Sequence, residues 1–345
     1  MATARVLAGP DVDVTKPDVR RLSARALDRD VTNSLAVEFV ALGADRAGDH
    51  DRAARLFHLS DRISRRSLPT RLWLIQASVD RGDVPGALRD FDIALRTSTD
   101  APKLLFPVLS RASTEPSLAP ALARLLDRPS DWRLPFLHDA ITDYGGAAGI
   151  AAVALRMRER GWLVANHVDD TLVGQLIVEE RYAEARVVQD AFHQTAESAS
   201  LVRDPAFADI RARYPFGWQI EDQGEIGARR GKANGRPVLA YQSQSGGSGP
   251  VATQLLILPS GRYRLTTRTA TPAEDGTAPP FWTLTCAGEN GQQIALLDEP
   301  PTGNASLDFI VPSGCGAQWL GLNLRGSDRP DGQSGAIAGI VVTRR

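Results

Sequence analysis

The chain has 345 residues, enough for two domains, and its hydrophobic share of 43% suits a globular protein that buries a core. Its 40 basic and 41 acidic side chains nearly balance, which argues against a nucleic-acid-binding protein, because such proteins carry a basic excess. No run of about 20 apolar residues exists, so the sequence predicts no transmembrane segment. Residues 1–16 lack the long apolar stretch of a signal peptide, and we expect a disordered leader there.

A repeat of 34 residues organises the first half. The signature residues of its two units are Gly48, Ala53, Phe57, Gly82, Ala87 and Phe91. The glycine lets the chain reverse between two helices, the alanine leaves room where the helices touch, and the phenylalanine fills the space between helix pairs. In this period the chain resembles the tetratricopeptide repeats, and the resemblance implies helical hairpins with a concave surface for a protein partner.

Helical periodicity continues through this half in chain order. The predicted helices cover residues 19–27, 34–46, 50–65, 70–81, 84–97, 102–113, 117–127, 133–142, 147–160, 170–179, 182–199 and 204–213. The last of them is expected because Asp204 can cap a helix whose first turn holds Pro205. Residues 17–212 are therefore predicted to form an α-solenoid.

The pattern changes at residues 214–218, where alternation by two replaces the helical period. The predicted strands cover residues 216–221, 225–229, 237–243, 251–258, 262–270, 281–287, 292–297, 306–311, 317–324 and 336–343. Short strands separated by polar loops favour an antiparallel β-sandwich of jelly-roll type over residues 214–345. The fold class expected for the whole chain is thus α + β multidomain.

The two cysteines, Cys286 and Cys315, both lie in the predicted sandwich. In a secreted protein such a pair forms one disulfide, whereas in a cytosolic protein it is two buried thiols. We favour the disulfide, because both residues flank strand-like segments of one small domain.

Three stretches give the second half a family resemblance. They are the closing strand at residues 335–343, the Gly-Arg-Tyr-Arg-Leu strand at 261–265 and the Phe-Trp-Thr-Leu strand at 281–284. With them the sandwich resembles non-catalytic carbohydrate-binding modules of jelly-roll form. Joined to helical repeats, it is similar to proteins encoded with bacterial exopolysaccharide systems. The resemblance implies a periplasmic or cell-envelope location, with the cytoplasm as the alternative.

No catalytic or cofactor-binding constellation is evident. The sequence lacks a Gly-x-Ser-x-Gly nucleophile elbow, and its five histidines all lie in the helical half without the spacing of metal ligands. The sequence therefore predicts no enzyme, no cofactor and no metal site.

Candidate carbohydrate-binding residues come from two predicted strands. Trp319 alternates with three leucines that face inward, so its indole should face outward, where it either stacks on a sugar ring or is covered by a loop or by the helical half. Arg262, Arg264 and Arg268 share one face of another strand, which is either a solvated face or a surface for sugars or an acidic polymer. Trp319 and the arginines can form one site only if their strands belong to the same sheet.

These features favour a non-enzymatic scaffold of cell-envelope or exopolysaccharide assembly. The solenoid would bind a protein partner, and the sandwich would bind polysaccharide. One alternative is a pure protein–protein adaptor in which the sandwich is only structural. A second alternative is a polysaccharide-modifying hydrolase, which would need two carboxylates at a fixed separation across a cleft.

Overall fold

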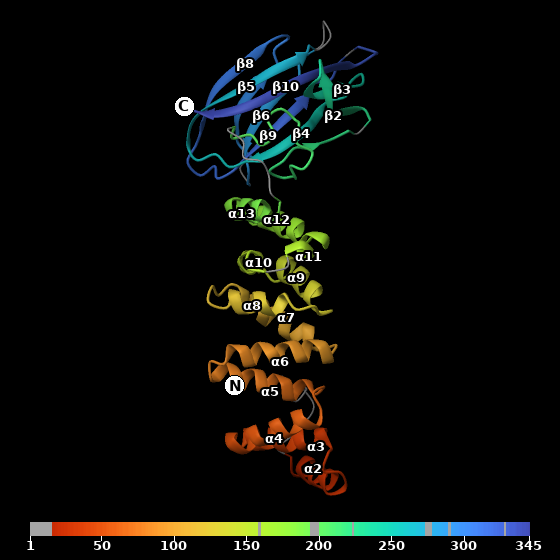
Figure 1. Ribbon diagram of the computed structural model, residues 1–345, viewed down its shortest axis with the longest axis vertical. Coiled ribbons are helices and arrows are strands. Elements are labelled where there is room, and N and C mark those ends of the chain that lie inside the picture. The colour runs from red at the N-terminus through yellow and green to blue at the C-terminus, as the bar shows by residue number, and fades with distance from the viewer. Residues whose placement is uncertain are drawn as a thin grey trace. The chain divides into compact units, whose positions relative to one another are not determined.

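The computed structural model describes residues 16–157, 160–193, 200–222, 224–272, 278–288, 291–327 and 329–345. The chain divides into two compact units, Met1–Gln175 and Leu176–Arg345. The first is helical, and the second contains the last helix and all of the strands (Figure 1). Apart from Lys16, the expected disordered leader lies outside the described residues.

The helices follow the predicted order with small changes at their ends and two larger differences: the helix predicted at 147–160 ends at Ala154, and a helix that was not predicted covers Arg160–Ala165. Residues 194–199, predicted to end the helix at 182–199, lie outside the described residues. The helices are α2 (Pro17–Arg29), α3 (Ser34–Arg46), α4 (His50–Ile63), α5 (Leu68–Asp80), α6 (Val84–Thr97), α7 (Ala101–Ser113), α8 (Ala119–Leu126), α9 (Arg133–Thr142), α10 (Ala147–Ala154), α11 (Arg160–Ala165), α12 (Val168–Val178) and α13 (Tyr182–Phe192). None of the helices within the described ranges has the length and apolar character needed to cross a bilayer. The helix predicted at 204–213 does not form; those residues are turns and irregular chain.

The two repeat glycines occupy the turns between paired helices. Gly48 has φ +81° and Gly82 has φ +71°, a left-handed conformation that glycine adopts without steric cost. Each is followed by an aspartate that caps the next helix, because Asp49 accepts from the Arg52 amide and Asp83 from the Gly86 amide. The turns thus connect α3 to α4 and α5 to α6, which pack against each other in pairs.

The small and large apolar residues of the repeat lie in the interior. Ala53 and Phe57 are fully buried on α4, and Ala87 and Phe91 are 5% exposed on α6. The Phe57 ring stacks on Trp73 of α5 with ring centroids 4.5 Å apart. This contact joins the first helix pair to the second, as a filler between hairpins should.

A buried ionic cluster connects three consecutive helices of this unit. Arg71 of α5 is only 2% exposed and forms ion pairs with Asp61 of α4 and Asp90 of α6. Burial raises the pKa of the Asp90 carboxyl, and the Arg71 guanidinium acts in the opposite direction. The arginine is therefore an interior residue of the helical unit, with a partner on each side.

The strands of the second unit form two antiparallel sheets of five. They are β1 (Gln219–Ile220), β2 (Ile226–Ala233), β3 (Arg236–Ser243), β4 (Gly249–Leu256), β5 (Gly261–Thr271), β6 (Phe281–Cys286), β7 (Gln293–Asp298), β8 (Asn304–Val311), β9 (Gln318–Leu324) and β10 (Gln333–Arg344). Sheet A has the order β1-β4-β9-β6-β7, and sheet B has the order β2-β3-β10-β5-β8. The predicted β-sandwich is confirmed.

The buried polar side chains of the sandwich include a carboxyl group. Glu299 is 3% exposed, and its oxygens accept hydrogen bonds from the Thr267 and Thr269 hydroxyls and from Trp282 Nε1. Burial raises the pKa of the Glu299 carboxyl, and these three hydrogen bonds offset only part of that shift. Trp282 itself is fully buried, so it belongs to the core.

Residues 200–218, the linker segment, complete the core from one side. Val202 and Phe207 are buried among the core residues of the two sheets. The Gln254 side chain forms two hydrogen bonds with the Arg203 backbone, and the Ile340 amide donates to the Pro205 carbonyl. The segment predicted to end the solenoid is thus part of the sandwich.

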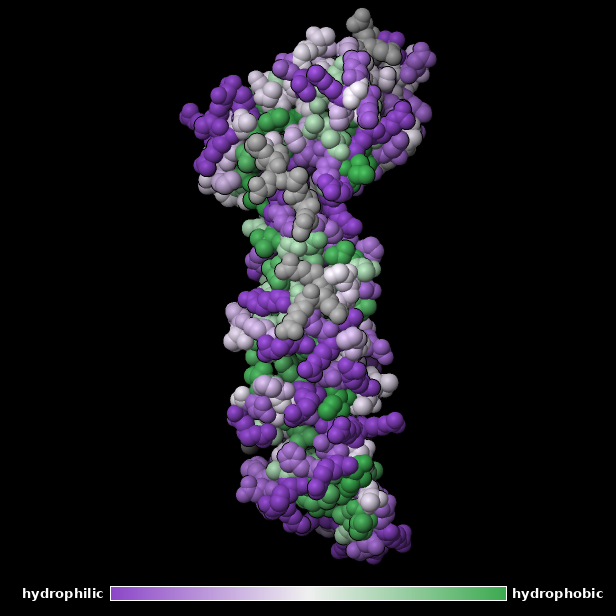
Figure 2. Space-filling view, viewed as in Figure 1, coloured by the Kyte–Doolittle hydropathy of each residue, from purple (hydrophilic) through white to green (hydrophobic). Residues whose placement is uncertain are grey.

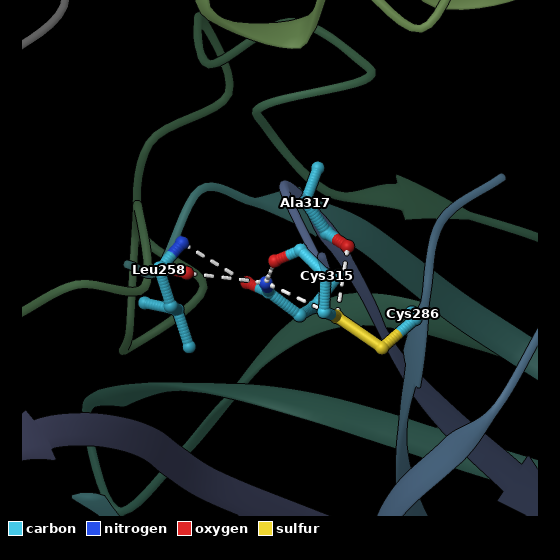
Figure 3. Close-up of a disulfide and its surroundings, with 5 residues drawn as sticks. Leu258, Cys286, Cys315 and Ala317 are labelled. Atoms are coloured by element: carbon cyan, nitrogen blue, oxygen red, sulfur yellow. Dashed lines mark hydrogen bonds between the residues drawn. A yellow bond between two sulfur atoms is a disulfide. The ribbon is translucent and has the colours of Figure 1, made fainter. Parts of the chain in front are cut away.

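Cys286 and Cys315 form the predicted disulfide (Figure 3). The bond joins the end of β6 to the loop before β9 and is nearly buried. Beside it, the Gln318 side chain donates to the Cys315 carbonyl and accepts from the Leu258 amide. The disulfide therefore lies in a hydrogen-bonded end of the sandwich that several loops share.

Candidate functional site

Trp319 lies on the outer face of sheet A. In β9 it alternates with the buried residues Gln318 and Leu320, and its indole is partly exposed. The ring of Tyr214 stacks on it, with centroids 5.9 Å apart and an interplanar angle of 17°. Tyr214 is itself 50% exposed. The two rings thus form an aromatic pair of which one member is half open.

The linker segment fixes the position of Tyr214. The next residue, Pro215, accepts a hydrogen bond from the Leu255 amide of β4, and Phe216 is fully buried. Gly217 permits this path, because a Cβ there would lie 2.4 Å from the backbone of Ala212. Burial raises the pKa of the Tyr214 hydroxyl above its ordinary value.

Next to the aromatic pair, the middle of this face is low and polar. Gly321 follows Trp319 by two residues, so it faces the same side, and a Cβ there would lie 3.3 Å from Thr283 Oγ1. Asn323 Nδ2 donates to the same threonine hydroxyl at 3.0 Å. Thr253 of β4 and Thr285 of β6 flank this row in register and are partly exposed. Hydroxyl and amide groups thus border a shallow floor.

The far end of the face carries a second aromatic side chain. Phe281 of β6 pairs with Asn323, and the Arg325 guanidinium lies 4.2 Å from the centre of its ring. Arg325 also donates to Asp298 at 2.6 Å, so its charge is compensated. Trp319 and Asn323 are four positions apart on the strand, which is about 13 Å. We call this surface, with its residues Tyr214, Thr253, Phe281, Thr283, Thr285, Trp319, Gly321 and Asn323, the sheet A face.

The arginine row lies elsewhere. Arg262, Arg264 and Arg268 belong to β5, which pairs with β8 and β10 in sheet B. Trp319 is in β9, which pairs with β4 and β6 in sheet A. Since the two groups face outward from opposite sheets, the condition for one shared site is not met, and the arginine row is separate from Trp319.

Of the residues on this face, sequence reasoning singled out only Trp319 as a binding residue, and Tyr214 is the missed residue that stacks on it. The change of pattern at residues 214–218 marked a boundary, but no local signal connects Tyr214 with Trp319 more than 100 positions later. The contact depends on how the linker segment crosses β4, which is a tertiary feature. In the described part of the sandwich, no three His, Cys, Asp or Glu side chains lie close enough to share a metal ion.

The chain matches no protein-family model and no curated protein. The sandwich region resembles solved carbohydrate-binding modules. A family 61 module in complex with β-1,4-galactotriose is 16% identical, with a TM-score of 0.30, over 43% of this chain and 100% of that one. A xylan-binding domain from Paenibacillus barcinonensis is 12% identical, with a TM-score of 0.29, over 43% and 97% of the two chains.

A putative sugar-binding protein from Bacteroides thetaiotaomicron is also similar. It is 10% identical, with a TM-score of 0.32, over 42% of this chain and 100% of that one. At these TM-scores the likeness identifies neither a family nor a ligand for this protein.

Proposed function

We propose that this protein is a non-enzymatic scaffold whose sandwich binds a neutral glycan on the sheet A face. The observation that carries the proposal is the Tyr214–Trp319 pair beside a row of threonine and asparagine side chains. An aromatic ring presents a flat apolar surface to the C–H groups of a pyranose, and the polar side chains can bond its hydroxyl groups. The compensated charge of Arg325 favours a neutral sugar over a uronate at this face.

The helical unit would bind a protein partner as a tetratricopeptide-like solenoid. This part of the proposal is supported by the two pairs α3/α4 and α5/α6, with their left-handed glycines, aspartate caps and buried phenylalanines. A protein that holds a partner on one unit and a polysaccharide on the other would suit cell-envelope or exopolysaccharide assembly. The Cys286–Cys315 disulfide supports an oxidising compartment such as the periplasm.

The alternative is an adaptor in which the sandwich is only structural. The observation that favours it is the partial cover of Trp319 by Tyr214, which leaves less of the indole for a ligand. The two functions differ in whether Tyr214 and Trp319 contribute to binding beyond their contribution to folding.

Titration of the full-length chain tests the proposal. A panel of neutral β-linked glycans, starting with β-1,4-galactotriose and soluble xylan, would be followed by tryptophan fluorescence and calorimetry. One open aromatic pair with a few polar contacts should give a Kd of about 0.1–1 mM. Trp319→Ala should abolish binding and shift the melting temperature by only a few degrees. Tyr214→Ala should weaken binding, whereas the matched control Tyr144→Ala, a similarly exposed tyrosine of the helical unit, should not.

Two results would refute the proposal. One is that no neutral glycan of the panel binds the wild-type chain at millimolar concentration. The other is that Trp319→Ala stays folded and binds as the wild type does. In either case the adaptor function becomes the better account of the sandwich.

A further inference from the structure

The strands of sheet B concentrate basic charge on a chain whose net charge is −1. They contain eight basic residues and one acidic residue, Asp308. Because side chains alternate between the two faces of a strand, Arg230 and Arg344 lie on the side of the buried residues. The other basic residues of these strands lie on the outer side or at the strand ends. The arginines on the outer side are Arg229, Arg236, Arg262, Arg264 and Arg268, and Arg345 follows β10 beside them. We call this surface the sheet B face.

Most of this charge is not compensated within the described part of the chain. Arg264 forms two hydrogen bonds with Asp308, at 2.6 and 2.7 Å, and Arg345 lies 3.7 Å from the same carboxylate. The side chains of Arg262 and Arg268 are exposed and have no ion pair among the described residues. One carboxylate therefore neutralises only part of a row of guanidinium groups.

A hollow of about 370 Å³ lies at the β2–β3–β10 end of the same face. Its floor is made of small residues that lie side by side in register, Ala240 of β3 and Ala336 of β10. Its rim carries Arg229, Thr271, the side chains of Gln242 and Ser334, and one acidic side chain, Asp222. A guanidinium, an amide, two hydroxyl groups and one carboxylate thus surround a space within the size range of small ligand sites, so the hollow suits neutral hydroxyl groups and the anion-binding part of the face is the arginine row on β5.

These features select the chemistry of a ligand. Arg262 and Arg264 are two residues apart on one strand, about 7 Å, and Arg268 is about 13 Å further along. A ligand that meets this row must carry several anionic groups along its length, and the polar rim of the hollow suits hydroxyl groups. The aromatic residues of these strands, Tyr241, Tyr263 and Phe309, are buried, so the face lacks the stacking platform that single-stranded nucleic acid requires.

We propose that the sheet B face binds an acidic polysaccharide whose uronate carboxylates pair with its arginines. Guanidinium and carboxylate groups match in charge and in bidentate geometry, which gives stronger hydrogen bonds than neutral partners form. On the side of the sandwich that Figure 2 shows, hydrophilic residues cover much of the surface, with hydrophobic residues between them. This site is independent of the neutral-glycan site, since it lies on the opposite sheet.

Polygalacturonate is the probe, and affinity electrophoresis of the full-length chain at 50 and 300 mM NaCl is the measurement. Arg262→Gln/Arg268→Gln should raise the Kd for polygalacturonate about tenfold or more. The control Arg62→Gln/Arg66→Gln removes the same charge from exposed positions of the helical unit and should change the Kd less than about twofold. Trp319→Ala should leave polygalacturonate binding unchanged, and the arginine variants should leave galactotriose binding unchanged.

Several outcomes would overturn the proposal. Equal losses in the two double variants would show that only net charge matters. Equally tight binding of duplex DNA would show a general polyanion surface. Loss of polygalacturonate binding in folded Trp319→Ala protein would move the polymer to the sheet A face. Absence of binding at 50 mM NaCl would exclude the site outright.

Discussion

Removal of the Phe207 ring tests whether the linker segment is part of the sandwich. Phe207 is 1% exposed, and its ring lies 5.2 Å from that of Trp218 in the core between the sheets. Its backbone is left-handed, with φ +58°, and alanine keeps the same β-carbon. The variant Phe207→Ala therefore retains the backbone strain and removes only the buried ring.

The expected loss follows from the burial. Truncation of a fully buried phenylalanine to alanine costs about 3–5 kcal/mol of unfolding free energy. The unit Leu176–Arg345 has 170 residues. For a unit of this size each kcal/mol lowers the melting temperature by about 2–4 °C, so Phe207→Ala should lower it by about 6–20 °C.

Hydrogen exchange with mass spectrometry during thermal unfolding would read the two units separately. Phe207→Ala should lower the melting temperature of β4, β9 and β10 and leave that of α3 to α6 unchanged. The matched control is Ile210→Ala, because Ile210 lies in the same segment and is 83% exposed; it should melt within about 2 °C of wild type. If Phe207→Ala melts like Ile210→Ala, the linker segment is not part of the sandwich core and the reasoning fails.

Two further variants probe a turn and a buried carboxyl. Gly82→Val should destabilise the helical unit by more than about 1 kcal/mol, because a β-branched residue is strained at φ +71°; a thermal melt equal to wild type would contradict this. Because the pKa of the Glu299 carboxyl is raised in the folded state, the folded state binds the carboxyl proton more tightly than the unfolded state does. Wild-type stability therefore falls as pH rises through the folded-state pKa. Glu299→Gln should therefore gain stability over wild type at pH 8 and lose that gain toward about pH 4; urea titrations in which the gain grows on acidification would refute this.

The local features of the fold could be predicted, because each depends on a few neighbouring residues. Asn33, Asp49 and Asp83 cap helices that begin where the sequence places them. The alternation in β9 placed the leucines inward and Trp319 outward. The ten strands were found because sheet burial imposes a period of two on their side chains.

The errors arose where tertiary contacts override local signals. Asp204 and Pro205 have the pattern of a helix start, yet Asp204 has φ +53° and the Pro205 carbonyl accepts from Ile340 of β10. The hydrogen bond between Pro205 and Ile340, which are 135 positions apart, outweighs the Asp-Pro pattern, because that pattern also occurs in turns that start no helix. The same limit applies to the candidate sites. Alternation shows on which side of a strand Trp319 and Arg264 lie, but only the pairing of strands shows that their sheets differ.

The buried Arg71 has a consequence for how this protein can change over generations. Its ion pairs connect α4, α5 and α6, so it requires one partner on the helix before and another on the helix after. A duplication or deletion of a hairpin at this point would separate the arginine from Asp61 or Asp90. Loss of one member of a buried ion pair costs about 3–5 kcal/mol, which is comparable to the whole stability of a small domain. Duplication or deletion of a helical hairpin is therefore less costly elsewhere in the helical unit than between α4 and α6.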